Sequence, residues 1–251
     1  MLGALKMAGP VLILGATSAI ARGAACAFAR RGHALYLAAR DLPELERIAA
    51  DLTIRYAVPV RCGVFDAEAY ATHNDFLDGV VREMKGLSGV LLASGYMGDP
   101  LAAREFESAS RVIAINFTGA ASILGLCADY MEQSKQGFII GITSVAGDRG
   151  RQSNYVYGAA KGGLSLFLQG LRNRLFPAGV QVLTVKPGFV DTAMTFGMPG
   201  LFLVASPTEV GERIVKSLEG RKNVVYLPWF WRYIMLIIRS IPESLFKRLK
   251  L

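Results

Sequence analysis

The sequence contains few cysteines and few histidines. Its three cysteines, Cys26, Cys62 and Cys127, are an odd number and lie far apart. This spacing predicts core packing in a reducing compartment rather than a disulfide framework. His33 and His73 have no cysteine or carboxylate cluster around them at metal-ligand spacing. We therefore predict no metal site and expect both histidines to lie near the surface.

A long apolar run is missing as well. No stretch of about 18 uncharged apolar residues stands out, so an ordinary transmembrane helix is not expected. The chain is nevertheless 52% hydrophobic over 251 residues, which is enough for a large core in one domain. Lys6, the apolar run after it and Ala19-Ile20-Ala21 are similar to a signal peptide, but Gly15 interrupts the run and favours a buried first strand.

Acidic residues are scarce at the C-terminal end. The formal net charge is +8, and residues 221–251 hold seven Lys or Arg against Glu243 alone. Within residues 226–251, YLPWFWRYIMLIIRSIPESLFKRLKL, basic residues alternate with aromatic and aliphatic ones. That mixture argues against nucleic acid and is typical of a segment lying on a bilayer surface, since its apolar part is too short to span one. Packing on the sheet or in a subunit interface remains the alternative.

Short apolar runs alternate with longer segments of helical character. The runs are predicted as buried parallel strands at 11–14, 34–38, 60–65, 89–93, 137–142, 180–185 and 224–227. Helices are predicted at about 19–31, 43–55, 68–84, 106–133, 154–176 and 207–218. The series predicts an α/β fold over residues 1–227: a Rossmann-like, doubly wound, seven-stranded parallel sheet with helices on both faces. Residues 228–251 form a separate C-terminal amphipathic segment.

The first strand leads into VLILGATSAIARG, residues 11–23, a candidate dinucleotide-binding turn. Gly15 fills the first glycine position, and Ala19 and Ala21 stand where further glycines are usual. Thr17 and Ser18 suit a helix N-terminus, where backbone N–H groups face a pyrophosphate. The pattern alone is a weak signal, and an ordinary strand–helix turn is the alternative.

The ends of the second and third strands bear on the choice of cofactor. The second strand ends at Ala38-Ala39-Arg40, with no acidic residue to accept bonds from a ribose. Arg40 can instead pair with a 2′-phosphate, which favours NADP(H) over NAD(H), unless it is a solvated loop residue. Asp66, after the third strand, is placed to bond the adenine edge, or to cap the helix that follows.

The strongest signal is ITSVAGDRGRQSNYVYGAAK, residues 142–161. Tyr157 and Lys161 lie one helical turn apart and share a face, and Ser144 ends a strand on the ligand side of the sheet. Hydride transfer to a ketone needs a proton donor, and a free tyrosine has a pKa of about 10. The Lys161 ammonium is expected to lower that pKa and to bond the nicotinamide ribose, while Ser144 orients the carbonyl. Tyr155 has the wrong offset to Lys161.

These residues, with Asn116 in INFTGA and KPGFVDT at 186–192, resemble the short-chain dehydrogenase/reductase family over about residues 10–220. The resemblance implies that Asn116 supports a water-linked proton relay through the lysine. It also implies a homodimer or homotetramer. The cofactor-binding residues that it implies are Gly15, Thr17, Ser18, Ala19, Ile20, Ala93, Gly95, Lys161, Pro187, Gly188, Val190 and Thr192. Ala93-Ser94-Gly95 departs from the Asn-Ala-Gly that is common after the fourth strand.

One subgroup is similar in further detail, the bacterial decaprenylphosphoryl-2-keto-ribose reductases, which form the reducing half of the arabinose-donor epimerase. The similar stretches are the tail, GATSAIA, SGYMGD at 94–99 and AGDRGRQSNYVYG at 146–158. The resemblance implies a keto-sugar linked to a polyprenyl phosphate, a partner oxidase, and a cytoplasmic enzyme at the inner face of the plasma membrane. Arg149 and Arg151 lie near the site mouth, where they could bind the substrate phosphate or belong to a solvated loop.

Two rival functions stay open. A reductase of acyl thioesters or sterol-like ketones would also suit an apolar tail, and a requirement for substrate phosphate would distinguish it. A non-catalytic nucleotide sensor or scaffold would be free to lose the serine, tyrosine or lysine, yet all three are present. The sequence therefore predicts an NAD(P)H-dependent ketone reductase.

Overall fold

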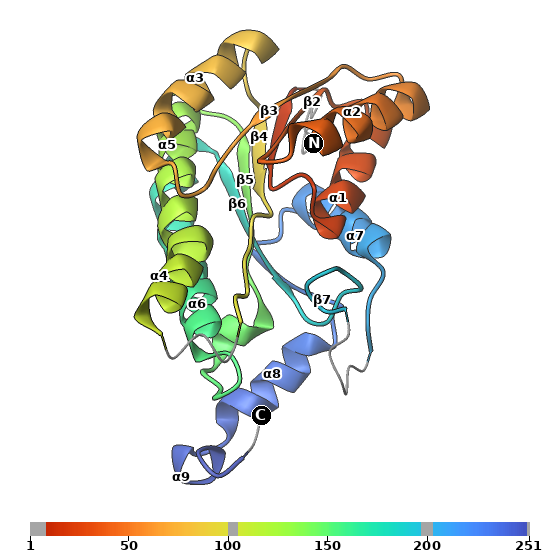
Figure 1. Ribbon diagram of the computed structural model, residues 1–251. Helices are drawn as coiled ribbons and strands as arrows, with labels where there is room; N and C mark the ends of the chain where they lie inside the picture. The colour runs from red at the N-terminus through yellow and green to blue at the C-terminus, as the bar shows by residue number, and fades with distance from the viewer. Residues whose placement is uncertain (1–8, 100–104, 197–202, 250–251) are drawn as a thin grey trace.

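The computed structural model describes residues 9–99, 105–196 and 203–249. Its centre is a seven-stranded sheet in the order β3-β2-β1-β4-β5-β6-β7 (Figure 1). The strands are β1 Val11–Leu14, β2 Leu35–Ala39, β3 Val60–Val64, β4 Gly89–Leu92, β5 Phe138–Ile142, β6 Gln181–Pro187 and β7 Val224–Leu227. Every neighbouring pair is parallel. The order reverses between β1 and β4, which places a ligand crevice at their carboxyl ends.

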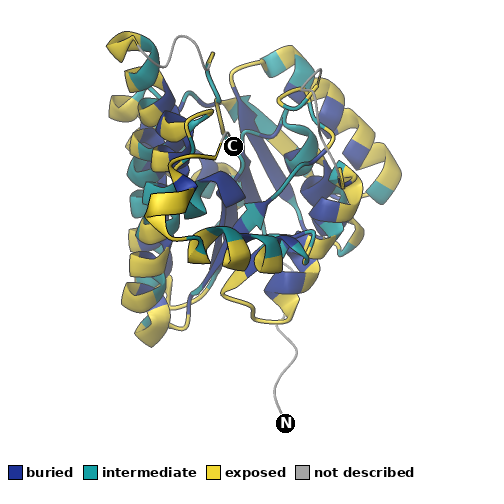
Figure 2. Cartoon of the chain, turned by 90° about the horizontal axis from the view of Figure 1, so that it is seen from below, coloured by how far each residue is buried: buried dark blue, intermediate teal, exposed yellow. Residues whose placement is uncertain are grey.

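Helices cover both faces of the sheet and create two cores. Along β1, Val11 and Ile13 join one core, while Leu12 and Leu14 join the other, as the alternation of a strand requires. The first core packs under α1 Ala19–Arg30, α2 Leu42–Tyr56 and α7 Pro207–Glu219. The second packs under α3 His73–Met84, α5 Gly119–Ser134 and α6 Tyr155–Leu175. Figure 2 shows the strands dark blue and the helices exposed on their outer sides. The predicted doubly wound fold is confirmed.

The predicted single helix over 106–133 is interrupted. α4 Phe106–Ile113 passes into a π-helical turn, Ala114–Thr118, before α5 begins. Such turns widen the helix locally and are frequent at functional sites. By length and composition alone, the stretch 106–134 is long and apolar enough to cross a membrane. Half of its most apolar window is buried inside the protein, however, and α5 packs on the sheet.

Both histidines lie in the interior, so their expected surface position was wrong. The His33 ring packs edge-on against Phe28, and its Nδ1 lies 2.9 Å from the Gly9 carbonyl oxygen. His73 bonds the Ser122 hydroxyl and the Asp66 carbonyl oxygen through its two ring nitrogens. Backbone carbonyls and a hydroxyl are therefore the hydrogen-bond partners of these buried rings. The described residues contain no cluster of three or more potential metal ligands.

The C-terminal segment folds into α8 Trp231–Ser240 and the short α9 Glu243–Phe246. Both lie at the lower end of the molecule in Figure 1. Trp231 and Met235 are buried against Val145, which follows β5. Leu236 and Ile237, on the opposite side of α8, are more than half exposed. The segment therefore packs on the body of the protein with one face and leaves an apolar face uncovered within the described chain.

Candidate active site

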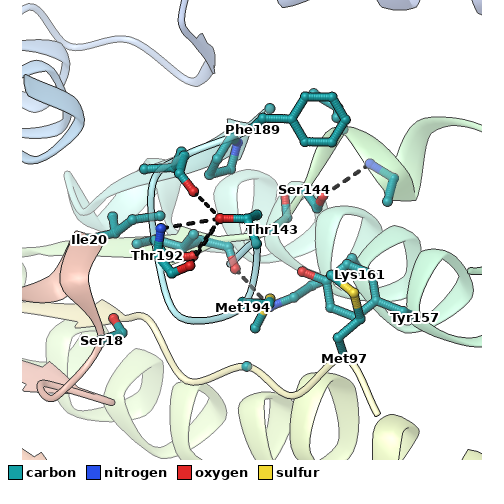
Figure 3. A pocket seen from close by; sticks show the side chains of 18 of the residues that line it. Ser18, Ile20, Met97, Thr143, Ser144, Tyr157, Lys161, Phe189, Thr192 and Met194 are labelled. Carbon is teal, nitrogen blue, oxygen red and sulfur yellow. Dashed lines mark hydrogen bonds between the residues drawn. The ribbon is translucent and has the colours of Figure 1, made fainter. Parts of the chain in front are cut away.

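A cavity of about 730 Å³ opens where the central strands end. Its walls come from the segments that follow β1, β4, β5 and β6, together with the first turns of α6. Figure 3 shows Ser144, Tyr157 and Lys161 close together inside it, with Met97 and Met194 beside the tyrosine. The parallel sheet therefore brings together five segments that are far apart in the sequence.

The turn after β1 has the geometry of a pyrophosphate cradle. Gly15 has φ +74°, and a Cβ there would lie 2.5 Å from the Ser94 backbone nitrogen. Glycine is thus required on two grounds, backbone conformation and space. Ser18 accepts a hydrogen bond from the Ala21 N–H at 3.2 Å and caps α1. Thr17, Ser18, Ala19 and Ile20 all line the cavity, so the N-terminus of α1 points its free N–H groups into it.

Arg40 and Asp66 lie outside the residues that line the cavity. Arg40 directly follows β2, is exposed, and makes no hydrogen bond or ion pair with any described residue. Asp66 accepts a hydrogen bond from the Glu68 N–H at 3.0 Å. That bond closes a local turn, and the helical segments that follow begin later, at Tyr70 and His73, so Asp66 does not cap a helix here. The contact with an adenine edge remains a prediction.

Tyr157 and Ser144 face each other across the cavity floor. Ser144 follows β5, and Tyr157 lies in the first turn of α6, with its side chain buried. The Ser144 Oγ accepts a hydrogen bond from the Ala146 N–H at 3.1 Å. Tyr155, the other tyrosine of the motif, is 48% exposed and points away from the core. The motif spacing therefore identified the buried tyrosine correctly.

Lys161 lies one turn further along α6 and is almost completely buried. Its Nζ lies 5.8 Å from the centre of the Tyr157 ring. The ammonium donates to the Ile142 carbonyl oxygen at 3.2 Å and approaches the Ser94 carbonyl oxygen at 3.5 Å. These two carbonyls end β5 and β4, so the lysine is held between the strand ends, beneath the open cavity.

Burial dominates the ionisation of this pair. It raises the pKa of Tyr157 to about 12, against the smaller lowering effect of the Ser144 hydrogen bond. It lowers the pKa of Lys161 to about 8. The expected lowering of the Tyr157 pKa by Lys161 was therefore wrong for this structure, since burial penalises the charged form of each side chain. Tyr157 is a neutral phenol at physiological pH, which is the form that can donate a proton.

Asn116 lies in the π-helical turn and is fully buried. Its Nδ2 donates to the Tyr96 and Val112 carbonyl oxygens at 2.5 and 2.8 Å, and its Oδ1 accepts from the Tyr96 N–H at 3.2 Å. The side chain thus clamps the segment after β4, which places Ala93 and Gly95 in the cavity wall. The proton-relay role remains a prediction, since Asn116 contacts backbone groups here.

The segment after β6 forms the wall opposite the cofactor turn. Pro187, Gly188, Val190 and Thr192 line the cavity as predicted. The Thr192 N–H donates to the Thr195 Oγ1 at 3.2 Å, which folds this segment back on itself. Behind it, a Cβ at Gly188 would collide with the indole ring of Trp231. The C-terminal helix α8 therefore supports the cavity wall from outside.

Sequence reasoning missed several lining residues. Arg151, which was expected near the site mouth, does line the cavity, but its neighbours were not expected. Met97, Phe189 and Met194 give the cavity large apolar surfaces, and Asn154 adds a polar group near Tyr157. These residues lie in loops close to the recognised motifs. Their position shortly after a strand end could have indicated that they line the cavity, because ligands bind beside the carboxyl ends of the strands.

Comparison with known proteins gives the family. The family model described as "short chain dehydrogenase" matches residues 10–198. An uncharacterised oxidoreductase of Mycobacterium tuberculosis is 35% identical over 245 residues, covering 96% of this chain and 97% of the relative. An uncharacterised oxidoreductase of Streptomyces coelicolor is 36% identical and covers 95% of both chains.

The chain belongs to the short-chain dehydrogenase family. A solved short-chain dehydrogenase from Sphingobium yanoikuyae, in complex with NADPH, superposes with a TM-score of 0.78 at 27% identity, covering 94% of this chain and 97% of the other. The predictions of the fold and of an NAD(P)-dependent oxidoreductase are thereby confirmed.

Proposed function

We propose that this short-chain dehydrogenase reduces the ring ketone of a polyprenyl-phosphate-linked keto-sugar to a secondary alcohol, with NADPH as the preferred reductant. One observation carries the reductase assignment. Ser144 and the buried side chains of Tyr157 and Lys161 line one open cavity, between a glycine turn and an apolar wall.

The residues present fit the cofactor. Gly15 lets the turn after β1 pack closely on the backbone of Ser94, and the capped N-terminus of α1 offers N–H groups for a pyrophosphate. Bound NADPH would supply the hydride. Tyr157 would donate its proton to the carbonyl oxygen as that oxygen becomes an alkoxide. Ser144 would hold the same oxygen by a hydrogen bond, and the Lys161 ammonium would stabilise the phenolate left on Tyr157.

The preference for NADPH rests on Arg40. It lies directly after β2, where an acidic residue would favour NAD, and no described residue pairs with its guanidinium. A free guanidinium at this position is suited to a 2′-phosphate. Asp66, one strand further along the sheet, is proposed to bond the adenine edge with the carboxylate oxygen that the turn leaves free.

Peripheral membrane contact by α8 and α9 would bring the enzyme to a lipid-linked substrate. Trp229, Tyr233, Leu236, Ile237 and Leu245 are all more than half exposed. Exposed Arg232, Arg239, Lys247 and Arg248 surround them. This combination suits an anionic bilayer surface, such as the cytoplasmic face of a plasma membrane. Removing residues 228–251 should then release the folded protein from anionic vesicles; a folded truncation that still co-sediments would place the anchor elsewhere.

Self-association through the long helices is also proposed. Leu166 on α6 and Phe176 just after it are strongly exposed apolar residues within the described chain. A homodimer or homotetramer formed by α5 and α6 would cover them, as is common in the family. A partner oxidase that produces the ketone is expected by analogy with the keto-ribose reductase subgroup.

The decisive experiment is NADPH oxidation by the purified protein with a polyprenyl-phosphoryl 2-keto-pentose. Tyr157→Phe is the matched control, because it removes one oxygen atom from the site. We expect turnover with the wild type that vanishes in the control. Turnover with acyl or sterol-like ketones, and none with the keto-pentose, would favour the second candidate. That candidate gains support from the apolar side chains of Met97, Phe189 and Met194 in the cavity.

A further inference from the structure

The loop between Ser144 and Tyr157 carries two arginines with opposite environments. Arg149 is fully engaged by the C-terminal segment. Its Nη1 donates to the carbonyl oxygens of Ile238, Arg239 and Ile241 at 3.2, 2.9 and 2.7 Å. Its Nη2 pairs with Glu243 at 2.8 Å, and its guanidinium lies 3.9 Å from the centre of the Phe246 ring. Arg149 therefore satisfies the last carbonyls of α8 and fixes α9, and it is neither a solvated residue nor a free anion site.

Arg151, two residues later, has none of these partners. It is half-buried and lines the cavity that contains Tyr157. Its Nε is buried without a hydrogen bond, and no described residue forms an ion pair with it. Burial lowers its pKa, because no carboxylate compensates for the water that it has lost.

The acid nearest to Arg151 in the sequence is already committed. Asp148 forms a buried ion pair with Lys186 and accepts a hydrogen bond from the Tyr226 hydroxyl at 2.6 Å. The loop thus keeps Arg151 partly desolvated and supplies no counter-charge. Such an arrangement costs stability unless a ligand completes it, because a buried charge needs a partner.

A second unsatisfied group lines the same cavity. The Asn154 Oδ1 is buried without a hydrogen-bond partner, and Asn154 lines the same cavity at the start of α6. A guanidinium and an amide oxygen together match an oxyanion next to a hydroxyl group. The planar guanidinium binds phosphate oxygens in pairs, and the amide oxygen accepts from an O–H.

We propose that Arg151 binds the phosphate oxyanion of the substrate inside the cavity, with Asn154 accepting a hydrogen bond from a neighbouring hydroxyl of the same molecule. The inference rests on the proposed function and makes it more specific, because it gives the two arginines of the loop different roles. Arg151 recognises the substrate anion and Arg149 holds the C-terminal segment. The apolar side chains of Met97, Phe189 and Met194 would then border the chain attached to the phosphate.

The test is a binding measurement that does not depend on turnover. Calorimetric titration of the full-length protein, saturated with NADP⁺, would compare farnesyl phosphate, farnesol and inorganic phosphate, with the lipids kept below micelle formation. We expect farnesyl phosphate to bind about 10- to 100-fold more tightly than farnesol, the range for a charge-assisted hydrogen bond. Inorganic phosphate should bind weakly, since it lacks the apolar chain.

Three variants sharpen the result. Arg151→Gln should remove the difference between farnesyl phosphate and farnesol, and Arg151→Lys should keep part of it. Arg82→Gln, an exposed residue on α3 with no ion pair among the described residues, loses the same charge and should bind like the wild type. Equal affinity for the two lipids in the wild type, no measurable binding of either, or an unchanged difference in Arg151→Gln would each overturn the assignment.

Kinetics separate this inference from the proposed function. With a polyprenyl-phosphoryl 2-keto-pentose, Arg151→Gln should raise KM and leave kcat nearly unchanged, because the residue binds substrate without reaching the ketone. If the wild type does not reduce that substrate but still prefers farnesyl phosphate through Arg151, the keto-sugar proposal fails and the anion site stands.

Discussion

The two halves of the cavity are built by different means. The half proposed for the cofactor is lined by small residues, such as Ala19, Ala93 and Gly95, each within a few residues of a strand end. The substrate half consists of long side chains, Met97, Arg151 and Phe189 among them, and α8 supports it from outside. The sheet alone therefore determines the half that binds a ligand common to many enzymes, and loops and the C-terminus determine the half that selects the substrate.

Tyr157 lies where the two halves meet, and its replacement should have the largest effect. Tyr157→Phe removes the proton donor and should reduce kcat by about 10²- to 10⁴-fold, the usual contribution of general acid catalysis. The phenyl ring fills the same space, so the affinity for NADPH should hardly change. Steady-state kinetics and a fluorescence titration with NADPH measure the two quantities. Undiminished turnover would show that another group donates the proton.

Trp231→Ala should weaken substrate binding and leave cofactor binding unchanged. The indole packs against Gly188 and, edge-on at 5.3 Å, against Phe189, so truncation leaves a cavity behind the wall. We expect a loss of about 3–5 kcal/mol in the free energy of unfolding. A rise in KM for the ketone should accompany it, with the NADPH dissociation constant nearly constant. Urea unfolding and kinetics test this.

The matched control is Trp229→Ala, since that ring is 63% exposed and should cost little stability. Equal losses in the two variants would mean that α8 does not support the wall. An NADPH affinity that falls in parallel with substrate affinity in Trp231→Ala would mean that the halves are not independent.

The candidate residues of the cofactor half could be named from the sequence, because their signals are local. Gly15, Ser144 and the Tyr157–Lys161 spacing each follow from one strand or one helical turn. The substrate half could not be predicted, since Arg149 contacts residues about 90 positions away and Trp231 packs on a loop before α7. The prediction that both histidines lie near the surface was wrong for a related reason. Residues on other segments bond their rings, and the hydropathy of the sequence does not reveal such contacts.

Arg40→Asp should change the cofactor half alone. Replacing the guanidinium with a carboxylate repels a 2′-phosphate and offers an acceptor to a ribose diol. The ratio of kcat/KM for NADPH to that for NADH should fall by about 10- to 100-fold, equivalent to roughly 1.4–2.8 kcal/mol. KM for the ketone should stay constant. An unchanged cofactor ratio would show that Arg40 is a surface residue without a role in recognition.

The buried charge of Lys161 should lower the free energy of unfolding, and the size of this effect should depend on pH. Its pKa is about 8 in the folded protein against 10.5 as the reference, so between these values the unfolded chain binds the proton and the folded chain does not. The contribution of Lys161 to stability therefore rises with pH across this window, by on the order of 1–3 kcal/mol. Urea unfolding at pH 7 and pH 10 should show this rise in the wild type relative to Lys161→Met. The kcat/KM for NADPH should fall around pH 8, where the folded protein loses the ammonium. Parallel stability curves for the two proteins would mean that the carbonyl oxygens of Ile142 and Ser94 compensate for the buried charge.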